Sequence, residues 1–456
     1  MKKIVFSLIV FASLVFVNTS CTKLLEVKPE GLVGIDEGIQ TSADLEQYLV
    51  SSYDVFRNGF VMGGTAATAA DVFADEAYAL STGFDWAQIK TLNTNLFNPV
   101  GRDIWRQSYL CLQRANVVID YLDNNRVVVT DIEKKHWKAE AQFIRGICYY
   151  HLLQYFSLPY VENTANLQPG VPLRTKAILS NEAAFEKVQR ASVNDVYTFL
   201  IAELMLAEAN LPTTAIAQGR ATQDGASAYL AKVYLQMNDM PKAYEYANKV
   251  AGSETYYLDP WWGDKYARAS LGNASHEVIF GLTSSAMGDN SGSGFINSYR
   301  TNKKDAPSFG PTDRLVASLS EYPVDTRAAQ IVLKAGDAAV PGVYSTKYNY
   351  EFMDAPVICL NEILLIRAEA GLATGQGDPT WDLNQIQARA GVPMTAASAA
   401  SILAERRKEL ALQGTYFFDL KRTRSNNIRG QAWNSSKLIF QIPDVEQNGN
   451  PSIILN

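Results

Sequence analysis

The sequence predicts a mostly α-helical protein built on a tetratricopeptide-like helical-repeat scaffold, with an irregular loop-rich insertion and a few short β-strands. Long stretches carry apolar residues at helical spacing, and Pro or Gly follows several of them where a helix should stop. Two such helical blocks span about 42–250 and 357–414. Between them, residues 251–355 hold Gly-Ser-Asn clusters and short β-like runs such as 278–280, but no long helical pattern. Long loops of this kind often carry function.

The first twenty residues have the order of a secretion signal. Lys2 and Lys3 precede an apolar run over 4–17, and small or polar residues lead to Cys21. The run is shorter than the roughly 20 apolar residues that a membrane-spanning helix needs, and its order fits a signal peptide. Ser20-Cys21 is similar to the cleavage junction of a bacterial lipoprotein. We therefore expect 1–20 to be a lipoprotein signal peptide and Cys21 to be the lipidation site.

The remaining chain, 21–456, is expected to form a single domain. Its helical candidates alternate with loops rich in Gly, Ser, Asn and Thr, and Leu211-Pro212 and Gly391 supply stop signals. The predicted helices are 42–58, 102–124, 131–156, 192–210, 223–237, 240–250, 357–374, 380–390 and 398–413.

One segment supports the repeat prediction directly. Within 227–255, Leu230, Ala231, Tyr234 and Ala243 stand at the spacing of the corresponding positions of a 34-residue tetratricopeptide unit. Such a unit is a pair of helices, and its small residues let the two helices approach closely. We expect a helix pair here.

Charge and cysteine usage narrow the functional classes. The chain has 41 Lys and Arg against 47 Asp and Glu, and no basic run interrupts this mildly acidic balance. Such a chain is a poor nucleic-acid binder, because phosphate contacts need clustered cations. Cys111, Cys148 and Cys359 cannot all pair with one another, and we predict buried free thiols.

Signatures of catalysis are missing from the sequence. It has no phosphate-binding glycine loop, no nucleophile elbow and no CxxC pair, and its three histidines are far apart. We therefore expect no enzyme activity, no metal and no cofactor. Asp71, Asp75 and Glu76 leave one alternative open, because a glycoside hydrolase needs two carboxylates across the scissile bond. Carboxylates so close in sequence more often face water or cap a helix.

Several segments that follow one another along the chain resemble the SusD/RagB family of outer-membrane nutrient-binding proteins. They include Ala139-Glu140-Ala141-Gln142-Phe143-Ile144-Arg145, Arg367-Ala368-Glu369, 383–391, Glu405-Arg406-Arg407-Lys408-Glu409-Leu410 and Asp419-Leu420-Lys421-Arg422. We interpret their charged residues, on amphipathic helices, as inter-helix ion pairs rather than ligand contacts.

The resemblance implies a SusD-like domain and a function. Members of this kind would bind a glycan or oligosaccharide without cleaving it and deliver it to a SusC-like TonB-dependent transporter. The protein would be lipid-anchored at the outer membrane and exposed at the cell surface. Three alternatives stay open: a peptide or glycopeptide ligand as in RagB-like members, a lipid-anchored glycoside hydrolase, and a purely structural helical adaptor.

Aromatic clusters give the best prediction of a ligand site. A sugar ring packs its apolar C–H face on Trp or Tyr, while its hydroxyls bind polar side chains. We expect the 251–300 region to bind the ligand, with Trp261 or Trp262 as the stacking residue, and a second cluster near Phe84 as the next candidate. The alternative is that these rings close a small core under a loop. The predicted binding residues are Tyr256, Tyr257, Trp261, Trp262, Arg300 and Trp86.

Overall fold

The computed structural model describes residues 38–80, 83–267, 275–284, 291–301, 307–334, 342–350 and 352–456. Residues Thr41–Asn456 form one compact unit, and Met1–Gln40 form another, of which only 38–40 are described. The predicted signal peptide and Cys21 therefore lie outside the described residues. Among the residues that are described, no helix is long and apolar enough to cross a membrane.

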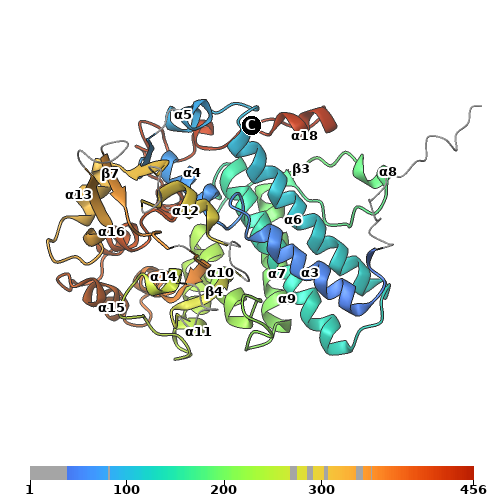
Figure 1. The fold of residues 1–456 in the computed structure, drawn as a ribbon, viewed down its shortest axis with the longest axis horizontal. Helices are drawn as coiled ribbons and strands as arrows, with labels where there is room; N and C mark the ends of the chain where they lie inside the picture. Colours follow the sequence, from blue (N-terminus) through green and yellow to red (C-terminus); the bar gives the residue numbers. More distant parts are fainter. Residues whose placement is uncertain are drawn as a thin grey trace, which may run out of the picture. The chain divides into compact units, whose positions relative to one another are not determined.

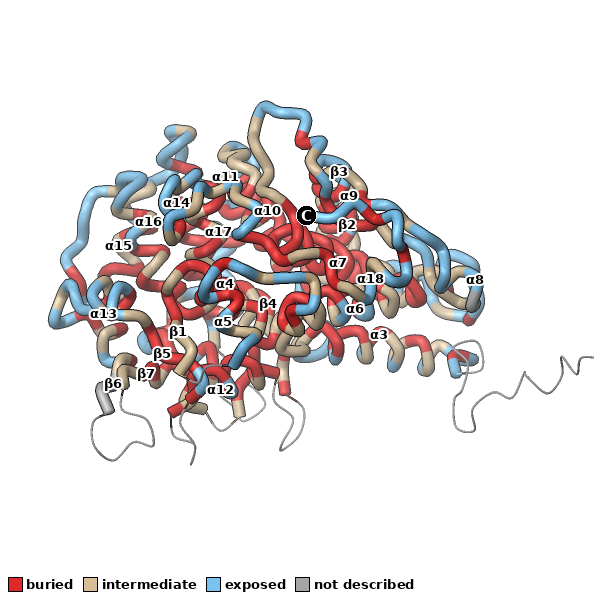
Figure 2. Tube along the Cα trace, turned by 90° about the horizontal axis from the view of Figure 1, so that it is seen from above, coloured by how far each residue is buried: buried red, intermediate tan, exposed pale blue. Residues whose placement is uncertain are grey.

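Four long helices stand side by side in the first half of the compact unit (Figure 1). Helix α7 is buried over most of its length because the neighbouring helices cover its sides (Figure 2). Thr130 and Glu133 form a capping box at its start. The four helices are α3 (Ser42–Phe56), α6 (Pro99–Asp123), α7 (Asp131–Phe156) and α9 (Val193–Asn210).

The predicted helix pair within 227–255 is confirmed. It consists of α10 (Gln223–Gln236) and α11 (Met240–Ala251), which pack on one another through the stacked rings of Tyr234 and Tyr246, 5.6 Å apart. Helix α11 also packs on α14, so the scaffold continues as predicted. The later helices are α14 (Leu360–Thr374), α15 (Pro379–Ala390), α16 (Ala399–Glu409) and α17 (Thr415–Arg422).

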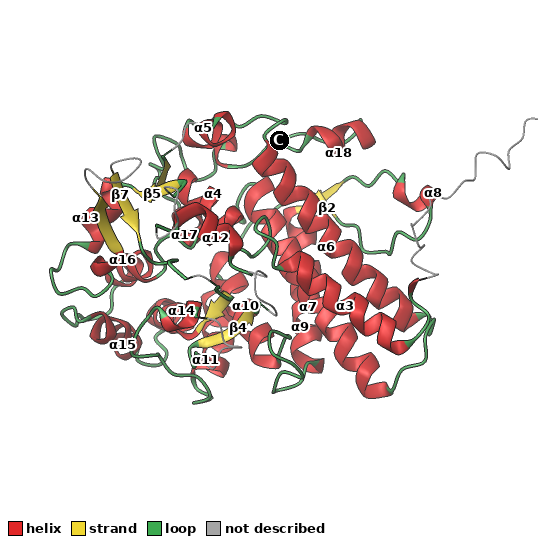
Figure 3. Ribbon diagram, in the orientation of Figure 1, coloured by secondary structure: helices red, strands yellow, loops and turns green. Residues whose placement is uncertain are grey.

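The segment predicted as an irregular insertion contains short elements that tie it to both helical blocks. Strand β5 pairs with β1, and β4 pairs with β8, both antiparallel. Figure 3 shows β5 and β7 away from the group formed by α3, α6, α7 and α9. Strand β4 lies beside that group, with the ring of Phe280 4.9 Å from that of Phe143 on α7. The strands are β1 (Ala77–Ala79), β2 (Pro169–Pro172), β3 (Arg190–Ser192), β4 (Val278–Leu282), β5 (Phe309–Pro311), β6 (Ile331–Lys334), β7 (Gly342–Ser345) and β8 (Ala355–Cys359).

Short helices fill the remaining space, and the sequence did not predict them. They are too short for the helical period to emerge from a window of 11–18 residues. They are α4 (Thr65–Phe73), α5 (Phe84–Lys90), α8 (Asn181–Ala184), α12 (Ser293–Tyr299), α13 (Asp313–Leu319), α18 (Asp444–Gly449) and the single 3-10 turns η3 (Asp264–Tyr266), η5 (Ala328–Gln330) and η6 (Ser436–Leu438).

The interpretation of the charged helix residues as ion pairs is confirmed. Arg145 pairs with Glu203 across α7 and α9 at 2.5 Å, and Arg367 pairs with Asp382 across α14 and α15 at 2.6 Å. Arg406 on α16 lies 3.2 Å from Asp419 on α17. The prediction of buried free thiols is also confirmed for Cys111, Cys148 and Cys359.

Candidate functional site

Two adjacent tryptophans line a cavity of about 260 Å³ just before η3. Trp261 is 45% exposed and Trp262 is 7% exposed, so one ring faces solvent while the other is nearly covered. Their ring centroids are 5.1 Å apart and the rings are tilted by 48°. Neighbours in an extended segment are expected to point to opposite faces, but here the chain turns and both rings reach the same cavity. The other walls are Ala329, Gln330, Thr346, Lys347, Asn349 and Tyr350.

The exposed ring of Trp261 is held in place by its neighbours. Tyr350 donates a hydrogen bond to the carbonyl of Gly263 at 2.8 Å, and its hydroxyl also bonds to Trp261. A Cβ on Gly263 would lie 2.5 Å from the indole nitrogen of Trp261 and 2.8 Å from the Tyr350 hydroxyl. Burial, with the charge of Asp264, raises the pKa of Tyr350 to about 12. The Tyr350 hydroxyl therefore stays protonated at neutral pH, and glycine is what permits this close approach.

The covered ring of Trp262 has a polar atom without a partner. Its indole N–H is buried and makes no hydrogen bond to any residue that the structure describes. An unmet buried donor costs on the order of 1–3 kcal/mol. Lys347, whose ammonium group lies 5.9 Å from the centre of this ring, occupies the same wall.

The polar residues of the cavity are ordered by the backbone around them. The carbonyl of Gln330 accepts hydrogen bonds from the backbone N–H of Thr346 at 2.7 Å and from its hydroxyl at 3.2 Å. The side chain of Asn349 accepts a bond from the backbone N–H of Thr301 at 2.7 Å and donates one to the Thr301 hydroxyl at 2.6 Å. Arg300 precedes Thr301 and is half-buried, but it is not a wall of the cavity.

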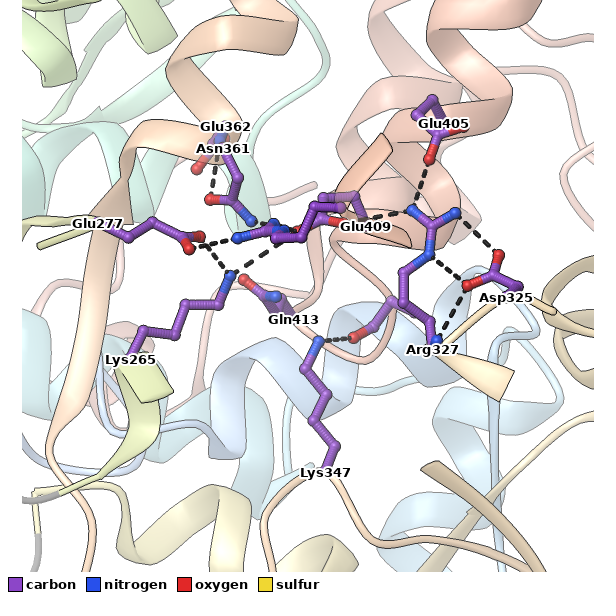
Figure 4. Close-up of polar contacts among 12 residues, drawn as sticks. Lys265, Glu277, Asp325, Arg327, Lys347, Asn361, Glu362, Glu405, Glu409 and Gln413 are labelled. Atoms are coloured by element: carbon purple, nitrogen blue, oxygen red, sulfur yellow. Dashed lines mark hydrogen bonds and ion pairs between the residues drawn. The ribbon is translucent and has the colours of Figure 1, made fainter. Parts of the chain in front are cut away.

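A buried ion network lies near Lys347, one of the walls of this cavity (Figure 4). Lys265, three residues after Trp262, donates to Glu277 at 2.8 Å, and Arg389 bonds both Glu277 and Glu409. Arg327 bonds Glu409 at 3.2 Å. The network joins η3, the residue before β4, α15 and α16, so it fixes the segment that carries the tryptophans against the helical scaffold.

Two pKa values in and beside the network are lowered, for different reasons. Burial alone would raise the pKa of the Glu409 carboxyl, but Arg389, Lys265 and Arg327 hold it well below its usual range. Burial, with the charge of Lys265, lowers the pKa of Lys347 to about 7. A neutral Lys347 donates to the carbonyl of Ala411 and presents no full charge to the cavity. The cavity wall therefore becomes less cationic as pH rises through neutrality.

The structure brings two of the six predicted binding residues together, Trp261 and Trp262. Tyr256 packs against the core formed by α14, α15 and α16, and it is hydrogen-bonded to Asp224. Tyr257 is 52% exposed and stacks on the ring of His276, 4.3 Å away. Trp86 on α5 is half-buried, with its ring edge-on to Phe309 at 4.6 Å.

Sequence reasoning missed the residues that face the tryptophans across the cavity. Lys347, Asn349 and Tyr350 follow β7, about 90 residues after Trp261. The run Lys347-Tyr348-Asn349-Tyr350 combines aromatic and amide side chains within the same loop-rich region. This composition could have marked the run as a candidate for ligand binding, but nothing in the sequence places the run beside Trp261.

The acidic cluster serves the structure of the core. Asp71 and Glu76 are both about 1% exposed. Asp71 accepts hydrogen bonds from the backbone N–H of Gly414 at 3.0 Å and from the Tyr299 hydroxyl at 3.2 Å. Glu76 is paired with Arg407 at 2.7 Å. This arrangement therefore gives no observation that favours hydrolysis. The described part of the chain also holds no cluster of three or more metal-ligating side chains.

Two family models match this sequence. A family model described as "Starch-binding associating with outer membrane" matches residues 23–235, and the model described as "SusD family" matches residues 334–452. SusD-like protein P2 of Formosa agariphila is 27% identical over 299 residues, which cover 64% of this chain and 55% of that protein. The match thus spans about half the length of that relative.

Solved structures share the architecture over nearly their whole length. A SusD superfamily protein from Bacteroides thetaiotaomicron superposes with a TM-score of 0.80 at 21% identity, covering 91% of this chain and 99% of that chain. A laminarin-binding SusD-like protein superposes with a TM-score of 0.76 at 23% identity, covering 92% and 99%. The two matched family models, on either side of the segment that carries the tryptophans, show that this chain belongs to the SusD/RagB family.

Proposed function

We propose that this protein binds a glycan or oligosaccharide in the Trp261–Trp262 cavity and releases it unchanged. In this proposal the protein delivers the glycan to a SusC-like TonB-dependent transporter. A lipid on Cys21 anchors the protein at the cell-surface side of the outer membrane. No cofactor takes part.

The observation that carries the proposal is the composition of the cavity. A partly exposed indole, Trp261, lies beside amide, hydroxyl and tyrosine groups. The flat ring buries the C–H face of a sugar without demanding one pattern of hydroxyls. The amides and hydroxyls around it offer hydrogen bonds that orient the ligand. The N–H of Trp262 is covered by protein atoms, so a sugar oxygen gives it a partner only after a small shift of the ring.

Family membership supports the same ligand class. The family model that matches residues 23–235 is described as starch-binding, and one structural neighbour binds laminarin. Both ligands are glucans, but the low identity leaves the sugar of this protein open. The proposal therefore names the glycan class and the cavity, and no particular linkage.

The proposal excludes turnover, and this can be measured together with binding. Purified full-length protein would be run through native gels that contain starch, laminarin or another soluble polysaccharide. Retardation by at least one glycan, with no new reducing ends after long incubation, is expected. Reducing ends that appear with parent protein and vanish with Asp75→Asn would support the hydrolase alternative. Binding of peptides with no retardation by any glycan would support the peptide alternative.

A further inference from the structure

A second cavity, of about 120 Å³, lies deep between α7, α10 and α17. Among its walls are Tyr150, Tyr229, Glu362, Arg406 and Phe418. It is several times larger than the roughly 10–15 Å³ that one water molecule needs. Phe418 is half-buried, as are Lys232 and Val357 in the same wall, so the cavity has a route to solvent.

Two polar groups in these walls lack hydrogen-bond partners among the described residues. The Nη1 of Arg406 and the Oε1 of Glu362 are buried and unbonded. Tyr150, a residue that is 6% exposed, brings a ring hydroxyl to the same walls. Buried polar groups are nearly always bonded, to protein or to another molecule. One unmet donor, one unmet acceptor and one hydroxyl in a single cavity therefore indicate a missing partner.

The charges of these groups are already balanced. Arg406 donates through Nε and Nη2 to the carboxylate of Asp419, at 3.2 and 3.3 Å. Lys232 lies 3.1 Å from Glu362 Oε1 without the angle of a hydrogen bond, and donates to Oε2 at 3.3 Å instead. A charged ligand would disturb this balance at a buried site, which is costly. The missing partner is therefore neutral, and it must both accept and donate hydrogen bonds.

We propose that this cavity binds one neutral sugar ring, or a polyol of the same size, as a site distinct from the tryptophan cavity. Adjacent ring hydroxyls each donate and accept, so one pair serves the Arg406 N–H and the Glu362 oxygen. Arg406 Nη2 lies 3.9 Å from Glu362 Oε1, so both residues are within reach of neighbouring hydroxyls. Both unbonded atoms are covered by protein atoms in the structure, so binding requires a small shift of the two side chains. The rings of Tyr229 and Phe418 provide apolar walls for the C–H groups.

Ligand-observed saturation-transfer NMR on the full-length protein tests this site. The probes are methyl β-D-glucopyranoside, methyl α-D-mannopyranoside and myo-inositol at millimolar concentration. At least one probe should bind the parent protein and the Trp261→Ala variant alike. Tyr150→Phe, which removes only the hydroxyl, should weaken that binding by about threefold to tenfold, as expected for one hydrogen bond. Glu362→Gln should weaken it at least as much.

A matched control separates the loss of a hydroxyl in this cavity from the loss of a buried tyrosine hydroxyl elsewhere in the protein. Tyr246→Phe changes a buried tyrosine of α11 that is not a wall of the cavity, and it should bind the probe like the parent. No binding of any probe would overturn the inference and leave the cavity to water. Binding that survives Tyr150→Phe and Glu362→Gln but is lost in Trp261→Ala would also overturn it. The first result does not bear on polysaccharide binding at the tryptophan cavity, which is measured separately, whereas the second would place the probe in that cavity.

Discussion

Arg406 shows how much a single buried charge contributes to the scaffold. It is 2% exposed and bonds Asp419, which Arg422 also approaches at 2.7 Å. Removing one partner of a buried pair leaves an uncompensated charge, which costs about 3–5 kcal/mol. We expect Arg406→Ala to lose about 3 kcal/mol of unfolding free energy, since Arg422 still compensates Asp419. Denaturant unfolding followed by circular dichroism measures this.

Tyr257→Ala is the comparison for that measurement. Tyr257 is half-exposed and stacks on His276, so its loss should cost less than about 1 kcal/mol. Equal destabilisation by the two variants would show that Arg406 is not a buried structural charge.

Lys421 gives a pH dependence with a defined sign. It is 1% exposed, donates to the carbonyl of Gln154 at 3.1 Å, and has no carboxylate partner within the described chain. Burial lowers its pKa from 10.5 to about 7. Between these values the unfolded chain holds a proton that the folded chain lacks, so stability rises with pH, by up to about 1.4 kcal/mol per unit. Below about pH 7 both the folded and the unfolded chain hold the proton, so stability no longer changes with pH through Lys421.

The test compares unfolding free energies from pH 6 to 9. Lys421→Met should flatten the rise between pH 7 and 9, although Lys347, with a similar pKa, retains part of it. Lys437→Met, at an exposed lysine, should leave the slope of the parent unchanged. An unaltered slope in Lys421→Met would mean that Lys421 is charged in the folded protein.

At the scale of the elements, one close approach fixes where α17 begins. Gly414, at the start of α17, has a φ of 74°, and a Cβ there would lie 2.7 Å from the Cα of Ala67 on α4. Gly375, at the end of α14, has a similar φ of 69°, but nothing lies within 4 Å of its Cβ position. The left-handed conformation alone costs a residue with a Cβ about 1–2 kcal/mol.

We therefore expect Gly375→Ala to lose about 1 kcal/mol and Gly414→Ala to lose clearly more. Thermal or denaturant unfolding of the two variants gives the comparison. If both lost the same amount, the contact between α17 and α4 would not be as tight as the structure has it.

The predictability of the elements follows their length. Helices such as α7 and α9 have several turns of regular spacing and clear caps, so the sequence located them. Helix α6 begins at Pro99, earlier than predicted, because Asn98 caps the backbone N–H groups of Val100 and Gly101. Strand pairs such as β1 with β5 join segments more than 200 residues apart, and no local pattern reports such a pairing.

At the scale of the whole molecule, the candidate site combines distant segments. Composition was enough to select Trp261 and Trp262 from the sequence. It could not place Tyr350 beside Trp261, because their contact depends on the tight turn at Gly263 and on the ion network near it. Composition also grouped Tyr256 with the tryptophans, although its ring belongs to the core of the later helices. The fold was therefore more predictable than the site.

Anchoring is a property of the whole chain and has its own test. If Cys21 carries the lipid, Cys21→Ala should abolish incorporation of a fatty-acid probe during growth, because the thiol is the acylation site. Cys359→Ala, at a buried thiol of the folded unit, should be labelled like the parent. Undiminished labelling of Cys21→Ala would contradict the lipoprotein proposal.

The most direct test of the account is the affinity of Trp261→Ala for a polysaccharide that retards the parent protein, measured by isothermal titration. Loss of the stacking ring should cost about 1–3 kcal/mol, a fall of about five- to 150-fold. Trp381→Ala is the matched control, because Trp381 is 63% exposed on α15 and does not line the cavity. We predict a large loss of affinity for Trp261→Ala and parental affinity for Trp381→Ala. Parental affinity in a folded Trp261→Ala variant would contradict the assignment and direct the search to Trp86.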